Sequence, residues 1–454
     1  MPTPIIQFWK QHKYPILFVI GNILFYASFA YDLDRTDFTK LLMLYVGAFF
    51  FCYKLIQLEH WNFKFLLAAG ILFRVVFLFA EPNLSQDFYR FIWDGELIKN
   101  GINPYLHTPN QLMEQPNFSI TNAKALYNGM GELSAKHFSN YPPINQVLFA
   151  LGAFLGGGSI LGSIIVMRLL LILADIGVLY FGKKLLENLK QPSHLIFWYF
   201  LNPLVIIELT GNLHFEGVML FFFIWAMYLI SQKKWYWAAP VYAISIMVKL
   251  VPILFLPIFL KYFGIKKSAL FYLLTGISCF LFLLPFYAPV FIDNYSETVG
   301  LWFSNFEFNA GIYNLIKKVA VTYFEAKPWE LIESYGSFVA KTVIIFTLLI
   351  AFLRKNQSLD SVLLSMLWAL SLYYFLSSTV HPWYLTFLVV LTIFTKYQYA
   401  IVWSLVVVLS YFAYSNPDYT ENLWLLSIEY ILVLGFFIYE LIGKHPKKLY
   451  FFKK

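Results

Sequence analysis

Apolar segments long enough to cross a lipid bilayer recur along almost the whole chain, and this feature restricts the possible fold most strongly. About 20 consecutive apolar residues span the hydrocarbon core as a helix. Hydrophobic residues make up 60% of the sequence and charged residues only 13%, unlike an average soluble domain. The sequence therefore predicts an all-α, polytopic integral membrane protein with about 13–14 transmembrane helices. The expected spans are 14–31, 39–57, 63–80, 160–182, 193–210, 214–230, two within 235–260, 269–289, 333–352, 360–377, 382–395, 399–414 and 423–441.

Two stretches do not fit a simple membrane span. The stretch 235–260 is short for two crossings and contains Pro240, Pro252 and Pro257, so broken half-helices are expected there. The stretch 144–156 runs into the sequence Gly-Gly-Gly-Ser, which favours a half-inserted helix. Broken backbone at membrane depth is tolerated where protein or a water-filled cavity surrounds it.

The distribution of basic residues predicts the orientation. With a cytoplasmic N-terminus, the inner segments, including the C-terminal tail, hold 20 lysine and arginine residues and the outer segments hold nine. Cytoplasmic loops normally carry such an excess. Both termini are therefore expected in the cytoplasm and the segment 81–141 outside. The first apolar run lacks a convincing small-residue cleavage site and is interpreted as a retained span.

Several other classes of protein are disfavoured. The net charge of +8 comes from short basic clusters between apolar runs, a pattern typical of cytoplasmic loops and not of a nucleic-acid-binding surface. Cys52 and Cys279 lie inside apolar stretches without metal-ligand spacing. No internal repeat is found, so residues 1–454 are expected to form a single membrane-embedded domain, with a helical first outer loop at 81–141 and a second at 290–332.

Five polar motifs fall on the outer side in this topology. A polar cluster at a membrane exit is where chemistry on a membrane-borne substrate is expected. The motifs are 85–105 with Asp87, Arg90, Trp93, Asp94, Asn103 and Tyr105; 141–146 with Tyr141 and Gln146; 202–216 with Glu208, Asn212, His214 and Glu216; 306–313 with Asn309; and 381–384 with His381, Trp383 and Tyr384.

A few cations lie within the apolar runs. A charge buried in a span costs about 2.5–3.5 kcal/mol on insertion scales, so it is usually paired or functional. Arg168 could bind a phosphate or join an ion-pair network with Asp175, seven residues later. Lys249 has no acid nearby in the sequence, which favours a functional contact.

The motifs resemble, in their order along the chain, the GT-C superfamily of polyprenol-phosphate-sugar-dependent glycosyltransferases, and especially its mannosyltransferases. The resemblance rests on Asp-x-Tyr-Arg-x-x-Trp-Asp-Gly, Gly-x-Asn-Pro-Tyr, Tyr-Pro-Pro-x-x-Gln, Asn-Pro-Leu-x-x-x-Glu-x-x-Gly-Asn-x-His, Lys-x-x-Pro and His-Pro-Trp-Tyr, which begin at residues 87, 101, 141, 202, 249 and 381. It implies a GT-C-type membrane enzyme that transfers a hexose, by family likeness mannose, from a polyprenyl-phosphate donor to a glycan or glycolipid acceptor. It also implies that Lys249 contacts the phosphate of this donor. The transfer inverts the anomeric centre on the extracytoplasmic face, and a bacterial cytoplasmic (inner) membrane is the expected location.

The resemblance also implies a general base in the first large outer loop. Inverting transfer needs a carboxylate that takes the proton of the acceptor hydroxyl, whereas the phosphate leaves as a stable anion. Asp87 is the first choice because it follows the predicted membrane exit after six residues, and the resemblance implies that an acid near this exit is the base. Asp94 is the alternative base, or it binds acceptor hydroxyls or orients the loop through Arg90.

Other roles remain open at this point. Arg90 can form a helix-surface ion pair or bind phosphate, and Trp93 and Tyr105 can be interfacial aromatics or stack on a sugar. His381, Trp383 and Tyr384 are expected to shape the donor or lipid groove. No cofactor is predicted: a divalent metal is not expected, since lysine or arginine can neutralise a single lipid phosphate.

A transporter or flippase of lipid-linked sugars is the competing interpretation, because it would also be helical and carry intramembrane charges. The missing repeat symmetry and the long acid-bearing outer loop argue against it. A ligase or polymerase of whole glycans would be expected to have its large loop late in the chain.

Overall fold

The computed structural model describes residues 4–304 and 306–443, and its regular structure is helical apart from one isolated bridge between Phe308 and Thr379. The first half comprises α1 (Pro4–Tyr31), α2 (Phe38–Glu59), α3 (Phe63–Val75), α4 (Asp87–Lys99), α5 (Pro109–Met113), α6 (Ala123–Ala135), α7 (Pro143–Leu155), α8 (Ile160–Asn188), η1 (Ser193–Ile196), α9 (Phe197–Phe200), α10 (Pro203–Val205), η2 (Ile206–Gly211) and α11 (Glu216–Ser231). The second half comprises α12 (Trp235–Val248), η3 (Val251–Phe259), α13 (Leu260–Phe263), α14 (Ile265–Leu283), η4 (Leu284–Phe286), α15 (Phe291–Ser304), α16 (Gly311–Phe324), α17 (Pro328–Leu353), α18 (Leu359–Leu376), η5 (Pro382–Tyr384), α19 (Leu385–Ile393), α20 (Tyr399–Val406), η6 (Val407–Ser415) and α21 (Leu423–Leu441).

The prediction of an all-α polytopic membrane protein is confirmed. Within the described residues, seven helices are long and apolar enough to cross a membrane, and a bent pair, 193–200 with 203–211, makes an eighth if it is one span. Six further apolar helices have 10–17 residues. The sequence placed spans at five of these shorter helices and a half-inserted helix at the sixth, Pro143–Leu155, so the expected 13–14 spans include several that are individually shorter than the bilayer is thick. The five tail lysines lie outside the described residues.

The predicted break within 235–260 is present. α12 ends at Val248, and Lys249 has an extended backbone with φ −148° and ψ 135°. The tighter 3₁₀ helix η3 follows, with Pro252 in its first turn. Proline lacks an N–H and its ring clashes with the carbonyl four residues earlier, which explains why α12 cannot continue.

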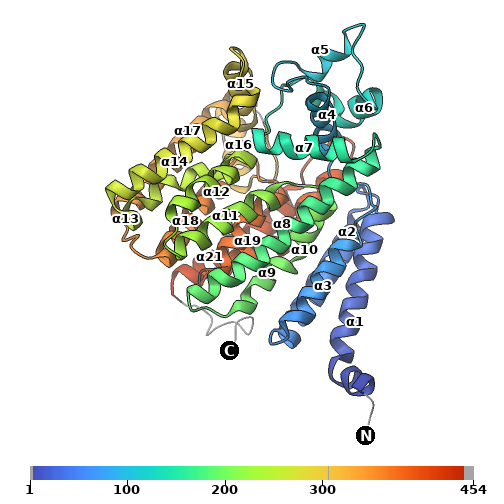
Figure 1. The fold of residues 1–454 in the computed structure, drawn as a ribbon, viewed down its shortest axis with the longest axis vertical. Helices are drawn as coiled ribbons and strands as arrows, with labels where there is room; N and C mark the ends of the chain where they lie inside the picture. The colour runs from blue at the N-terminus through green and yellow to red at the C-terminus, as the bar shows by residue number, and fades with distance from the viewer. Residues whose placement is uncertain (1–3, 305, 444–454) are drawn as a thin grey trace.

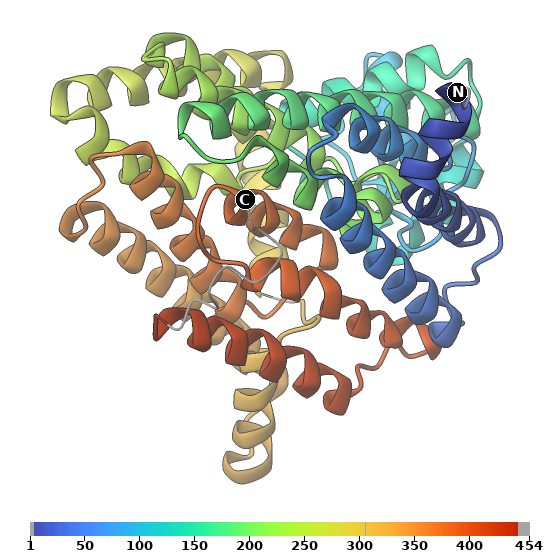
Figure 2. The same cartoon turned by 90° about the horizontal axis from the view of Figure 1, so that it is seen from below.

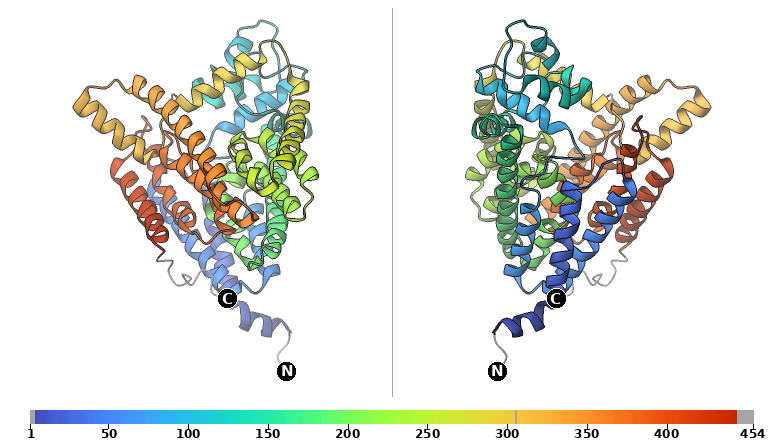
Figure 3. Two further views of the ribbon diagram at one scale, coloured as in Figure 1. Left: turned by 90° about the vertical axis from the view of Figure 1, so that its left-hand side faces the viewer. Right: turned by 90° about the vertical axis from the view of Figure 1, so that its right-hand side faces the viewer.

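The helical segment between α3 and α8 lies at one end of the molecule. Figure 1 shows α4, α5, α6 and α7 together above the long helices, so the first loop is helical as predicted. The start of α1 and the end of α21 lie at the opposite end (Figure 1, Figure 3). Seen from below, α1, α2 and α3 form a group beside the C-terminal helices, while the hairpin of α16 and α17 projects from the body (Figure 2).

The buried Arg168 fixes the backbone beneath this segment. Arg168 donates to the carbonyls of Thr210 (2.8 Å), Gly211 (2.9 Å), Ala80 (2.7 Å) and Leu78 (3.1 Å). It thereby ties the link between α3 and α4 to the π-helical turn η2. These contacts are structural, and none of them leaves the guanidinium facing a substrate.

One of the two roles considered for Arg168, an ion-pair network with Asp175, is wrong. Asp175 instead pairs with Arg74 at 2.9 Å and accepts a hydrogen bond from Tyr199 at 2.7 Å. Seven residues correspond to a rise of about 10.5 Å along a helix. A shared face therefore did not bring the Arg168 and Asp175 side chains together.

Candidate functional site

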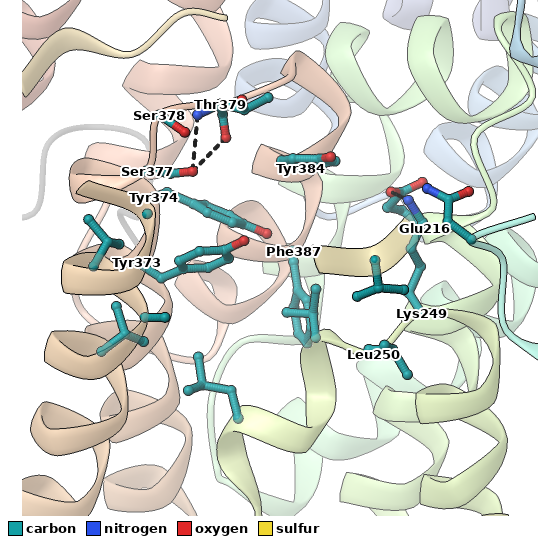
Figure 4. Close-up of a pocket in the computed structure, with 18 of the residues that line it drawn as sticks. Glu216, Lys249, Leu250, Tyr373, Tyr374, Ser377, Ser378, Thr379, Tyr384 and Phe387 are labelled. Carbon is teal, nitrogen blue, oxygen red and sulfur yellow. Dashed lines mark hydrogen bonds and ion pairs between the residues drawn. The ribbon is translucent and has the colours of Figure 1, made fainter. Parts of the chain in front are cut away.

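A cavity of about 350 Å³ lies below α7, between the break after α12 and the helices α17, α18 and α19. Its lower walls are apolar and include Leu254 of η3 and Val339 and Val343 of α17. Its upper part is polar and includes Asn140, Tyr141, Glu216, Lys249, Ser378, Thr379 and Tyr384. Figure 4 shows Glu216 and Lys249 on one side, Tyr373, Tyr374 and Ser377 on the other, and Tyr384 above Phe387. The cavity therefore combines a charged end with a long apolar wall.

An ion pair forms the charged end. The ammonium of Lys249 lies 2.6 Å from Oε1 of Glu216, with side-chain exposures of 26% and 6%. Glu216 is the first residue of α11, where the helix dipole favours a negative charge. The ammonium also lies 5.7 Å from the ring centroid of Tyr384. The break after α12 thus delivers a cation to the cavity, and α11 supplies its partner.

Tyrosine and serine side chains line the end of the cavity opposite the ion pair. Tyr373 and Tyr374 come from the last turn of α18, and Ser377 follows it. Thr379 is held in place by the 2.6 Å hydrogen bond from its hydroxyl to the carbonyl of Phe306, and the bridge to Phe308 lies beside it. The segment 290–332 thus fixes the chain between α18 and η5.

Asp87 is the first residue of α4, and its side chain is half-buried. It does not line the cavity, but its carboxyl is electrostatically coupled to the two charged residues that do, Lys249 and Glu216, and to His214. Burial raises the pKa of Asp87, while His214 and Lys249 act in the opposite direction. A partly desolvated carboxylate beside a cation is suited to accept a proton.

Stacked rings border the polar end of the cavity. His214 stacks on Trp383 with centroids 3.7 Å apart, and Trp383 stacks on His381 at 4.4 Å. Phe308 continues the stack at 5.1 Å from His381. Burial lowers the pKa of His381 to about 3, with the charges of His214 and Lys249 adding to the effect. His381 is therefore neutral at physiological pH.

Glu208 connects this stack to the loop that carries Asp87. Its Oε2 lies 3.3 Å from Nε2 of His214, and its Oε1 accepts hydrogen bonds from Tyr411 and from Asn212 at 3.3 Å. Oδ1 of Asn212 in turn accepts from the backbone N–H of Leu84 at 3.2 Å. These predicted site residues thus anchor the chain at Leu84, three residues before Asp87.

Asp94 occupies a different environment. It is fully buried, and its carboxylate accepts hydrogen bonds from Arg90 (2.8 Å), Ser139 (2.6 Å) and Gln146 (2.9 Å). Arg90 also donates to the carbonyls of Ser134 and His137. Asp94, Arg90 and Gln146 thus hold α4 against α7 and the end of α6, and the structure gives them no contact with the cavity.

Several other predicted binding residues also lie away from the cavity. Trp93 is fully buried and packs against Phe118 and Tyr127, which leaves no ring face for a sugar. The side chains of Asn103 and Tyr105 bond to the carbonyls of Phe286 and Tyr141, respectively. Asn309 is buried, and its amide donates to Glu429 at 3.0 Å. These residues connect elements, because buried polar groups normally find partners inside the protein.

Of the predicted site residues, the structure therefore brings Tyr141, Lys249 and Tyr384 to the cavity, with Asp87, His214, His381 and Trp383 beside its polar end. The sequence named Glu216 within the 202–216 motif but assigned it no binding role, and it did not predict Tyr374 and Ser378. Glu216 had a signal in the sequence, an acid two residues after His214 at the start of an apolar run. Tyr374 and Ser378 had none beyond their nearness to the His-Pro-Trp-Tyr motif.

No group of three or more histidine, cysteine, aspartate or glutamate side chains within the described residues could hold a metal ion. The charged groups at and beside the cavity are Lys249, Glu216 and Asp87.

Comparison with known proteins finds similarity to mannopyranosyltransferases. The family model described as alpha-(1->6)-mannopyranosyltransferase, N-terminal domain, matches residues 27–263, more than half of the chain. A relative, alpha-(1->6)-mannopyranosyltransferase A of Mycobacterium tuberculosis (strain ATCC 25618 / H37Rv), is 22% identical over 153 residues. That stretch is 34% of this chain and 28% of the relative. The chain thus aligns with less than a third of the relative's length.

Proposed function

The chain belongs to the alpha-(1->6)-mannopyranosyltransferase family, and from this premise we propose that it is a membrane glycosyltransferase that moves a mannosyl group. The donor in this proposal is a polyprenyl-phosphate mannose. The acceptor is a hydroxyl of a glycan or glycolipid on the extracytoplasmic face, and the anomeric centre is inverted.

The observation that carries this proposal is the cation Lys249 at the polar end of a cavity with apolar walls. Lys249 lies at the polar end, while Leu254, Val339 and Val343 line the wall that continues along α17, a helix of membrane-spanning length. A lipid phosphate has this same division between a charged head and a long apolar tail. A lysine is able to neutralise such a phosphate.

In the proposed reaction Asp87 is the general base. Its carboxylate takes the proton of the acceptor hydroxyl while the new glycosidic bond forms and the bond from the anomeric carbon to the phosphate oxygen breaks. The phosphate leaves as an anion next to Lys249, so a second acid is not required. Half-burial and proximity to Lys249 favour Asp87 over Asp94, whose carboxylate already accepts three hydrogen bonds from protein side chains.

The decisive experiment measures transfer from radiolabelled polyprenyl-phosphate mannose in membranes that contain wild type or Asp87→Asn. Positioned base catalysis contributes about 10²–10⁴-fold, so Asp87→Asn should lose transfer by this factor while the protein remains folded. Transfer at the wild-type rate in the variant would exclude Asp87 as the base. Lipid movement without transfer in the wild type would instead favour a flippase.

The proposed chemistry requires no divalent metal, because the ammonium of Lys249 neutralises the leaving phosphate. Transfer should therefore be unchanged after a chelator is added. A loss that magnesium or manganese restores would contradict this part of the proposal.

A further inference from the structure

Lys249 already has an anionic partner in the structure, and this pairing affects how a donor can bind. Glu216 lies 2.6 Å from the ammonium, and both side chains line the cavity. Asp87 adds a second negative charge in the same neighbourhood. A phosphate that enters the cavity therefore meets a cation that is neutralised rather than free.

We infer that Glu216 competes with the donor phosphate for Lys249, so that donor binding transfers the ammonium from the glutamate to the lipid phosphate. This inference rests on the proposed function, since it takes the ligand to be a lipid phosphate. Glu216 is then a residue that sets donor affinity and balances the charge of Lys249 when no donor is bound.

The geometry supports an exchange of partners. Glu216 is the first residue of α11, whereas Lys249 lies in the extended link between α12 and η3, where its backbone N–H donates to the carbonyl of Ser245 at 3.2 Å. The lysine side chain is the more exposed of the two and reaches over the ring of Tyr384. Rotation of a flexible lysine side chain could thus move its ammonium along the cavity while the carboxylate stays in place.

The pairing of Lys249 with Glu216 also has a physical reason. An unpaired charge within a membrane-embedded cavity is costly, and Glu216 removes that cost for Lys249. When the phosphate arrives it repels both Glu216 and Asp87. The wild-type cavity therefore binds the phosphate more weakly than a cavity with Lys249 and no carboxylates would.

The test compares binding of undecaprenyl phosphate and of undecaprenol, its uncharged analogue, to purified protein in nanodiscs. Glu216→Gln keeps the shape of the side chain and removes the competing charge. It should bind the phosphate lipid about three- to tenfold more tightly than wild type does, with unchanged affinity for the alcohol. Lys249→Gln should bind both lipids equally.

Two further variants distinguish an effect of the Glu216 charge from a general effect of substitution on the fold. Glu216→Asp retains the carboxylate and should restore affinity toward the wild-type value. The matched control is Glu330→Gln, which removes a glutamate from an exposed ion pair with Lys327 at 2.9 Å, outside the cavity. This control should bind both lipids as wild type does.

The results distinguish failure of the inference from failure of the proposed function. If wild type prefers the phosphate but Glu216→Gln binds it equally or more weakly, Glu216 orients Lys249 and does not compete, and only the inference is overturned. If wild type does not distinguish the two lipids, the lipid-phosphate donor is itself refuted, and the inference is refuted with it.

Discussion

At the residue scale, the charges around Asp87 predict opposite pH effects for two variants. Lys249 lowers and Glu216 raises the pKa of Asp87. A general base works only when deprotonated, so kcat/KM should fall as the pH drops through this pKa. Lys249→Met should move the acid limb to higher pH, and Glu216→Gln should move it to lower pH. The measurement is the pH profile of kcat/KM for transfer.

The control for these profiles is Lys327→Met, because Lys327 forms an exposed pair with Glu330 outside the cavity. Its acid limb should coincide with that of wild type. If the Lys249 and Glu216 variants shift the limb in the same direction, the limb does not report on Asp87.

Two aspartates on one helix should respond differently to the same substitution. Asp94→Asn leaves the buried guanidinium of Arg90 without its charged partner, and breaking a buried pair costs about 3–5 kcal/mol. The variant should therefore unfold at a clearly lower temperature in detergent, whereas Asp87→Asn should unfold near the wild-type temperature. Equal thermal stability of the two variants would contradict the structural role of Asp94.

The sequence located the site residues only in part. Residues next to a predictable break or chain turn, such as Lys249 and Tyr384, reach the cavity. Trp93 and Asp94 share a motif with Asp87, yet they lie in the middle of α4, which is buried on every side from residue 90 to 97, whereas Asp87 is at its half-buried start. Spacing in a motif shows which residues share a face, but the partner of each face depends on packing between distant elements.

At the scale of elements, the contact between α4 and α7 depends on one glycine. A Cβ added to Gly95 would lie 2.3 Å from the backbone oxygen of Phe149, and backbone atoms cannot easily move aside. Gly95→Ala should separate α4 from α7, lower the unfolding temperature and reduce transfer, because Asp87 begins α4. Thermal unfolding and transfer assays check this prediction.

The matched substitution is Gly276→Ala in α14, where an added Cβ would meet no atom within 4 Å. It should leave both stability and transfer close to wild type, since alanine is the better helix former. A Gly95 variant that behaves like the Gly276 variant would show that the two helices tolerate a wider spacing.

Helix positions were more predictable than site residues because apolar length and proline are local signals. The expected spans 423–441 and 39–57 agree closely with α21 and α2. The span expected at 63–80 ends early, since α3 stops at Val75. The chain there must turn toward Arg168, which binds the carbonyls of Leu78 and Ala80, and a hydropathy pattern contains no information about that distant partner.

At the scale of the whole molecule, the orientation in the membrane remains a prediction of the charge asymmetry. Gln115 follows α5 and Gln232 follows α11, and both are exposed. Gln115→Cys should react with a membrane-impermeant maleimide in intact cells. Gln232→Cys should react only after permeabilisation, because it lies beside the inner lysines 233 and 234.

Cys52 is buried and Cys279 is half-buried, so the unsubstituted protein measures the background labelling. The reverse pattern would place Asp87 in the cytoplasm and remove the extracytoplasmic reaction from the proposal.

The start of α1 and the end of α21 both lie at the end of the molecule farthest from α4, α5, α6 and α7 (Figure 1, Figure 3). A fluorescent reporter or a surface tether attached to the start of α1 or the end of α21 would therefore stand at the opposite end of the molecule from α4, the helix that carries Asp87. Immobilised protein would present one uniform face to the solution, and an antibody fragment raised against that face would be free to reach it.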